Sequence, residues 1–256
     1  MIFLRSTSGW LLVGLLLLLW ELSAQLGWVV SPNWPPLSQV LAAGWHDMAT
    51  GELAVRLAGT LWRAALGLAI GSAAGIAAGF AMAQSRLVAR TLGPVVELFR
   101  PIPVPAIIPP LILFLGVDDA MKLAIIALTA FFPVAISTRQ GAASVDPTLL
   151  ASARTLGVPR WRTFLAIIWP ATLPFVLAGV RVSLALALVV AVVGEMIAGD
   201  SGIGHYLVLM QFAVRAAEMY AAILLLAVVG YTLNRGFIAI EKRLLFWYSA
   251  EARAAA

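Results

Sequence analysis

Long apolar runs dominate this chain and restrict it to a membrane fold. Hydrophobic residues make up 62% of the 256 positions and charged residues 11%, whereas a soluble domain carries about 25% charged residues. A helix that crosses about 30 Å of hydrocarbon needs about 20 apolar residues. Stretches of this kind lie at 10–30, 61–83, 94–116, 120–138, 171–198 and 218–240. The sequence therefore predicts an all-α membrane protein with six transmembrane helices.

The first stretch allows a second interpretation. Arg5 precedes a leucine-rich segment, which is also the pattern of a cleaved signal peptide. No small-x-small cleavage site follows Trp20, and apolar residues continue to Val30. We therefore expect a retained span, followed by an outer-surface turn and a helix along or into the membrane at 37–63.

The residue inventory excludes several kinds of chemistry. The chain has no cysteine, which rules out disulfides and cysteine-ligated zinc or iron–sulfur sites. His46 and His205 alone leave little for metal binding or a proton relay. A net charge of +5 in so apolar a chain favours basic residues at the inner membrane face over nucleic-acid binding. We expect no metal and no cofactor in this chain.

Basic residues orient the spans. Loops on the cytoplasmic side of a membrane protein are enriched in lysine and arginine. With the amino terminus inside, the inner set is Arg5, Arg86, Arg90, Arg100, Arg139, Arg154, Arg160, Arg162, Arg235, Lys242, Arg243 and Arg253. The outer set is Arg56, Arg63, Lys122 and Arg215. This orientation predicts that both termini and the polar segment 139–170 are cytoplasmic.

The 139–170 segment predicts a rigid elbow between two spans. Asp146 is suited to cap a short helix, Pro147 to its first turn, and Gly157 to a left-handed stop. We expect a small apolar contact surface with a charge at its rim. Its residues are Ala151, Ala153, Leu156 and, for the charge, Arg154.

The spacing in this segment resembles the EAA loop of ABC importer permeases. That loop reads EAA, three residues, Gly, nine residues, Ile, two residues, Pro. The match holds at Ala153, Gly157, Ile167 and Pro170, whereas Ala151 stands where the family has Glu. Segments 100–105, 116–122 and 194–204 resemble the "LRPIP" start, the outer turn and the "AEM…SGLG" stretch of the nitrate, sulfonate and taurine group.

The resemblance implies a type I ABC importer permease-like bundle with a cytoplasmic coupling helix in a bacterial inner membrane. It implies an amino-terminal helix and outer segment over 1–58, a five-helix core over 59–245 and a cytoplasmic tail over 246–256. The implied partners are the lipid bilayer, two ATP-binding subunits that hold ATP and Mg, a second permease copy or sibling, and an outer solute-binding protein. The implied solute is small and anionic, such as nitrate, taurine or another sulfonate, and small heterocycles also fit the resemblance.

Four glycines recur every four residues within 61–83. Gly67, Gly71, Gly75 and Gly79 trace a narrow stripe along one helix face. Such a stripe allows a neighbouring helix to approach closely in lipid. It predicts a tightly packed bundle and no particular activity.

Ionisable groups inside spans mark candidate pathway residues. Arg181 and Glu195 fall within 171–198, about 21 Å apart along a helix and on one face. Either these two residues line a transport pathway, or each charge is compensated by a neighbouring helix or reaches the membrane interface. Pro101 and Pro103 bend the third span, which lipid tolerates only where neighbouring helices or a water-filled cavity satisfy the freed backbone groups. We expect the adjacent Glu97 and Arg100 to neutralise each other.

Two other functions compete with the importer. Gly199-Asp200-Ser201-Gly202 has the G-x-S-G form of an intramembrane serine protease, but that chemistry needs a histidine on another span. A secondary transporter or channel is the stronger alternative. Such carriers usually have inverted repeats and mid-span charges, which are scarce here.

Overall fold

The computed structural model describes residues 2–247, with side chains from residue 9 onward. The predicted tail 246–256 therefore lies almost entirely outside the described residues, as do Arg253 and the side chain of Arg5. The helices are α1 (Ile2–Gln25), α2 (Leu37–Ala49), α3 (Glu52–Gln84), α4 (Arg86–Phe99), α5 (Val104–Leu115), α6 (Asp119–Ala143), α7 (Pro147–Thr155), α8 (Arg160–Thr163), the π-helix η1 (Phe164–Ile168), α9 (Trp169–Ala198), α10 (Gly202–Phe212) and α11 (Ala216–Leu244).

Four helical segments are long and apolar enough to cross a membrane. They are α3, α6, the continuous run Arg160–Ala198 and α11. The apolar part of α1 with described side chains, Gly9–Gln25, is shorter than these. The all-α membrane architecture is thus confirmed, while the count of six spans is approximate.

The bent span predicted at 94–116 is two separate helices. The chain folds there into α4 and α5, whose axes meet at 105°. Pro101 and Pro103 explain the break, because proline disfavours the α conformation in the residue before it and offers no N–H to a helix. The helix expected at 37–63 is likewise two helices, since Gly51 adopts φ +84° between α2 and α3.

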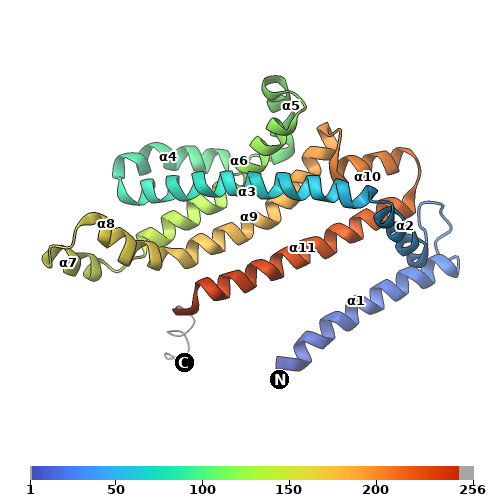
Figure 1. Ribbon diagram of the computed structural model, residues 1–256, viewed down its shortest axis with the longest axis horizontal. Coiled ribbons are helices and arrows are strands. Elements are labelled where there is room, and N and C mark those ends of the chain that lie inside the picture. The colour runs from blue at the N-terminus through green and yellow to red at the C-terminus, as the bar shows by residue number, and fades with distance from the viewer. Residues whose placement is uncertain (1, 248–256) are drawn as a thin grey trace.

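Helices α3, α6 and α9 run along the long axis and form the centre of the bundle (Figure 1). The glycine stripe of α3 lies against α6. A Cβ at Gly71 would lie 2.9 Å from the Ala130 Cβ and closer still to the Ala127 carbonyl oxygen, and one at Gly75 would lie 2.8 Å from the Phe131 oxygen. Gly67 and Gly79 approach Ile126 and Thr138 in the same way. Only glycine permits these two backbones to come so close.

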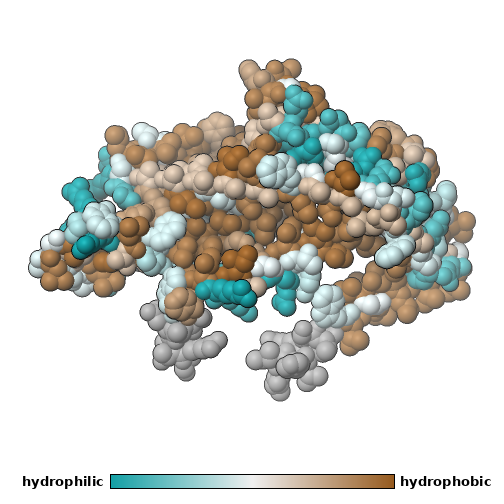
Figure 2. Space-filling model, in the orientation of Figure 1, coloured by the Kyte–Doolittle hydropathy of each residue, from teal (hydrophilic) through white to brown (hydrophobic). Residues whose placement is uncertain are grey.

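The two ends of the bundle differ in character. Helix α7 lies at one end, and α2 and α10 lie at the other (Figure 1). In Figure 2 apolar colour covers the middle of the body, while polar colour gathers toward these ends. We call them the α7 end and the α10 end.

Helix α1 lies beside the bundle near α2 (Figure 1). An aromatic cluster attaches it there, because the rings of Trp20, Trp34 and Tyr220 pack within 6.2 Å of one another. Trp20 also donates a hydrogen bond to the Pro35 carbonyl at 3.1 Å. The turn that follows α1 therefore joins it to α11.

Candidate functional site

The short helix of the elbow, α7, has a defined cap at each end. The Asp146 carboxylate accepts a hydrogen bond from the Thr148 N–H at 2.8 Å, and this bond lowers the pKa of Asp146. At the other end Gly157 adopts φ +68°. Its N–H bonds to the Arg154 carbonyl at 3.0 Å, while Val158 N–H bonds to the Ala153 carbonyl at 2.9 Å. This pair of bonds is a Schellman motif, which ends a helix abruptly.

The exposed face of α7 is partly apolar. Leu149 is 53% exposed and Leu156 is 79% exposed, and Ala151 and Arg154 are also exposed. Ala153 differs from the expectation, because it is buried with 5% exposure and therefore anchors the helix. Leu156 is the C-cap residue of α7, two turns after Leu149, so the two exposed leucines lie toward the same side of the helix.

Ile167 and Pro170 lie where the elbow joins the next long helix. The chain does not break there, because the run 160–198 continues through a π-helical turn at 164–168. Proline has no N–H, so a widened turn just before Pro170 allows the helix to continue. The rings of Phe164 and Trp169 pack on Phe80 of α3, with centroids 5.1 and 5.8 Å away. This contact packs the end of the elbow against α3.

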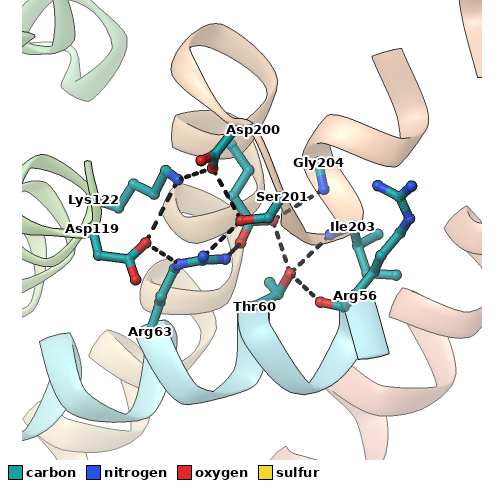
Figure 3. A network of polar contacts seen from close by, with 10 residues as sticks. Arg56, Thr60, Arg63, Asp119, Lys122, Asp200, Ser201, Ile203 and Gly204 are labelled. Carbon is teal, nitrogen blue, oxygen red and sulfur yellow. Dashed lines mark hydrogen bonds and ion pairs between the residues drawn. The ribbon is translucent and has the colours of Figure 1, made fainter. Parts of the chain in front are cut away.

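A buried polar network occupies the α10 end (Figure 3). Its centre is Glu195 of α9, which has no exposed surface. Its carboxylate accepts hydrogen bonds from Arg63 Nη1 at 3.0 Å, Thr60 Oγ1 at 2.8 Å and the Gly204 N–H at 3.0 Å. Arg63 Nη2 also donates to Ser201 Oγ at 2.8 Å. The buried carboxylate is therefore compensated by one cation and by neutral donors.

This arrangement depends on the start of α10. The positive end of that helix faces Glu195, because Gly204 N–H donates to the carboxylate and Ile203 N–H donates to Thr60 Oγ1 at 2.9 Å. Gly202 has φ +93°, and a Cβ there would collide with the Glu195 carboxyl group. The glycine is thus required both by its backbone angle and by the carboxylate beside it.

A second set of ions continues the network to the α5–α6 turn. Arg63 Nε donates to Asp119 Oδ1 at 2.7 Å. Lys122, which is 1% exposed, lies 3.6 Å from Asp119 and 3.1 Å from Asp200. The Lys122 hydrogen bond, together with one from Ser201, lowers the pKa of Asp200 to about 2. The network therefore joins α3, α6, α9 and α10 at one end of the bundle.

Two hollows accompany these features. A cleft of about 960 Å³ beside the network is lined by charged residues of α2, α3 and the α9–α10 turn, among them Glu52, Arg56 and Asp200. A cavity of about 420 Å³ lies between the α4–α5 bend, α6 and α9. Its lining is mostly apolar and includes Arg100 and Thr129.

The structure separates the two charges expected to share a pathway face. Glu195 is bound within the network, whereas Arg181 reaches α11, where its Nε donates to Asn234 at 3.3 Å and Nη1 lies 3.9 Å from Glu241. Arg181 is absent from the lining of the 420 Å³ cavity, while Ile102 between Pro101 and Pro103 is part of it.

The expected neutralisation of Arg100 by Glu97 is wrong, because no ion pair joins them within 4.0 Å. Sequence reasoning also missed the partners of Glu195. The sequence indicates Arg63 only as an outer cation, and nothing in the spacing of residues 60, 63 and 195 reveals that they meet.

Comparison with known proteins decides the family. The profile described as "Binding-protein-dependent transport system inner membrane component" matches residues 67–245. The chain belongs to this family.

Permease protein SsuC of Escherichia coli (strain K12), named for aliphatic sulfonates transport, is 33% identical over 96% of this chain and 94% of its own. Taurine transport system permease protein TauC of the same organism is 31% identical over 92% and 88%. Riboflavin transport system permease protein RibX of Chloroflexus aurantiacus is 33% identical over 91% and 87%.

Solved structures support the same fold. A chain of the MetNI methionine ABC transporter in an inward facing conformation superposes with a TM-score of 0.63 at 16% identity, covering 72% of this chain and 92% of that one. A chain of an amino acid ABC transporter gives 0.62 at 18% identity, covering 78% and 95%.

The protein is therefore a binding-protein-dependent ABC importer permease, a translocation subunit and not a catalyst. Ser201 belongs to the polar network: its hydroxyl accepts a hydrogen bond from Arg63 and donates one to Asp200.

Proposed function

We propose that this permease imports a small sulfonate, such as taurine or an alkanesulfonate, and that α7 couples it to a separate ATPase. The observation that supports the coupling is the exposed patch of Leu149 and Leu156 at the tip of a helix fixed by an Asp146 cap and a Gly157 stop. A rigid, partly apolar helix that stands away from the bundle core is suited to dock in a partner groove.

The α7 end faces the cytoplasm in this proposal, and both termini lie on that side. Arginines at the elbow, among them Arg154, Arg160 and Arg162, agree with the positive-inside rule. Two ATP-binding subunits hold ATP and Mg there, and an outer solute-binding protein docks at the α10 end.

A second permease copy or a sibling completes the pathway. It covers the side from which α5 projects, where Leu113 and Phe114 are each 85% exposed (Figure 1). The 420 Å³ cavity lies at the base of this projection, next to the α4–α5 bend.

The solute class rests on the relatives. SsuC and TauC are named for aliphatic sulfonates and taurine, whereas RibX is named for riboflavin. Uptake of radiolabelled taurine, ethanesulfonate and riboflavin into proteoliposomes holding the whole importer distinguishes these classes. We expect ATP-dependent uptake of a sulfonate; uptake driven by an ion gradient without the ATPase would instead favour a secondary carrier.

Coupling is tested by co-purification of the ATPase with the permease. Gly157→Val forces a β-branched residue into the left-handed region, and Arg154→Glu reverses the rim charge. Both should lower the recovery of ATPase while the permease still elutes as a folded species. Arg90→Glu, at an exposed position outside the elbow, should leave recovery unchanged. Normal recovery with both elbow variants would contradict the coupling role.

A further inference from the structure

The cavity at the α4–α5 bend carries a single charge. Its lining combines the bend itself with the middle turns of α6 and α9, including Thr129, Pro133, Ser137 and Leu186. Among the described residues that line it, Arg100 alone is ionised at neutral pH. Its volume of about 420 Å³ falls in the range of small-molecule sites.

Arg100 is unpaired within residues 9–247. The ion pairs in these residues involve other arginines and Lys122, and none of them includes Arg100. This contrasts with Arg63, which is compensated by two carboxylates. Arg100 therefore keeps its full capacity to bind an anion.

Arg100 lies partway along the bundle and is exposed in the single chain. Helix α4 starts at the turn after α3 and runs for 14 residues, which places Arg100 about 20 Å in from that end. The cavity residues of α6 run from Ile125 to Ser137, in the middle of the helix Asp119–Ala143. An arginine at this depth is costly in hydrocarbon and is normally found facing water or a partner.

The bend brings together the partly negative end of α4 and the partly positive start of α5, so its net charge is that of Arg100. Arg100 ends α4, and α5 begins a few residues later at Val104, which also lines the cavity. The start of a helix carries a partial positive charge. Interrupted membrane helices of other carriers direct such ends at anionic solutes.

We propose that Arg100 binds the anionic group of the solute, a sulfonate or similar oxyanion, inside a water-filled half of the pathway. The identity of the solute rests on the proposed function, but the site itself does not. A guanidinium is suited to this role because it donates several hydrogen bonds in a fork to an oxyanion. The residue that selects the anion is then Arg100 at the bend, while Arg181 attaches α9 to α11.

The absence of cysteine permits a direct test of water access and charge preference. Ser137→Cys places one thiol in the cavity lining. In membranes holding the full importer, its reaction rate is measured with the anionic reagent MTSES, itself a sulfonate, and with the cationic reagent MTSET. The ratio of the two rates is then compared among backgrounds with Arg100, Arg100→Lys and Arg100→Gln.

We expect both reagents to react, and the MTSES to MTSET ratio to fall about tenfold in Arg100→Gln, since one nearby charge enriches counter-ions by about this factor. Arg100→Lys should keep the ratio. Arg90→Gln removes an equal charge from the same helix about 15 Å away and should also keep it. Co-purification of the ATPase with each variant shows that the complex remains assembled.

Two results would overturn the proposal. A thiol at 137 that neither reagent reaches would show that the cavity holds no water. An unchanged ratio in Arg100→Gln would show that Arg100 does not select anions. Neither labelling result requires transport of the solute, so failure here is distinct from failure of sulfonate uptake.

Discussion

Replacing Gly71 with alanine should separate the two central helices. The new Cβ would lie 2.9 Å from the Ala130 Cβ and closer to the Ala127 carbonyl oxygen, whereas ordinary contacts begin at 3.4 Å. A backbone oxygen cannot move without its helix, so α3 and α6 must shift apart locally by about 1 Å.

The expected loss of stability follows from two opposing terms. Overpacking costs about 1–3 kcal/mol, and the helix preference of alanine over glycine returns about 1 kcal/mol. The net loss for Gly71→Ala is then up to about 2 kcal/mol, which corresponds to a fall in Tm of about 4–8 °C for a chain of this size.

Thermal melting of the detergent-purified permease, followed by tryptophan fluorescence, measures this fall. Gly236→Ala is the matched control, because a Cβ at that exposed position of α11 meets nothing within 4 Å. The control should melt at or slightly above the wild-type temperature. If Gly71→Ala melts as high as Gly236→Ala, the close approach of α3 and α6 is refuted.

The polar network yields two further predictions in the same melting assay. Glu195→Gln leaves Arg63 without its buried carboxylate and should lower the free energy of unfolding by about 3 kcal/mol. Glu218→Gln, at the partly exposed pair with Arg215, should lower it by less than about 1 kcal/mol. Equal losses of stability in the two variants would contradict a buried network. The wild type should be more stable than Asp200→Asn at neutral pH, because the folded pKa of Asp200 is depressed from 3.8 to about 2. That advantage should hold down to pH 3.8 and vanish as the pH falls toward about 2; a gap that closes at higher pH would argue against the ion pair with Lys122.

Much of the fold was predictable because apolar length and glycine spacing are local properties of the sequence. The four glycines of α3 recur at intervals of four, so a close helix contact followed directly, and the structure places α6 against them. The α7 cap was equally local, since Asp146, Pro147 and Gly157 each act within a few residues.

The bend at residues 100–103 was underestimated. Its prolines were visible, but the angle of 105° depends on how α4 and α5 pack on α6. The same holds for Arg100, whose place partway along the bundle follows from the return of α4 along α3 and not from its distance to the nearest polar loop.

The polar network could not be found from sequence. Glu195 lies more than 130 residues after both Thr60 and Arg63 in the sequence. The packing of α3 against α9 and the start of α10 bring the three residues together. A lone glutamate inside an apolar run was a sound signal of importance. It gave no indication of which cation compensates it.

The central claim is that α7 faces the cytoplasm and contacts the ATPase, and a single cysteine tests it most directly. Leu156→Cys introduces one thiol at a 79% exposed position of an otherwise cysteine-free chain. A membrane-impermeant maleimide should label it in inside-out vesicles stripped of ATPase, fail to label it in intact cells, and label it weakly when the ATPase is bound. Labelling in intact cells would contradict the account.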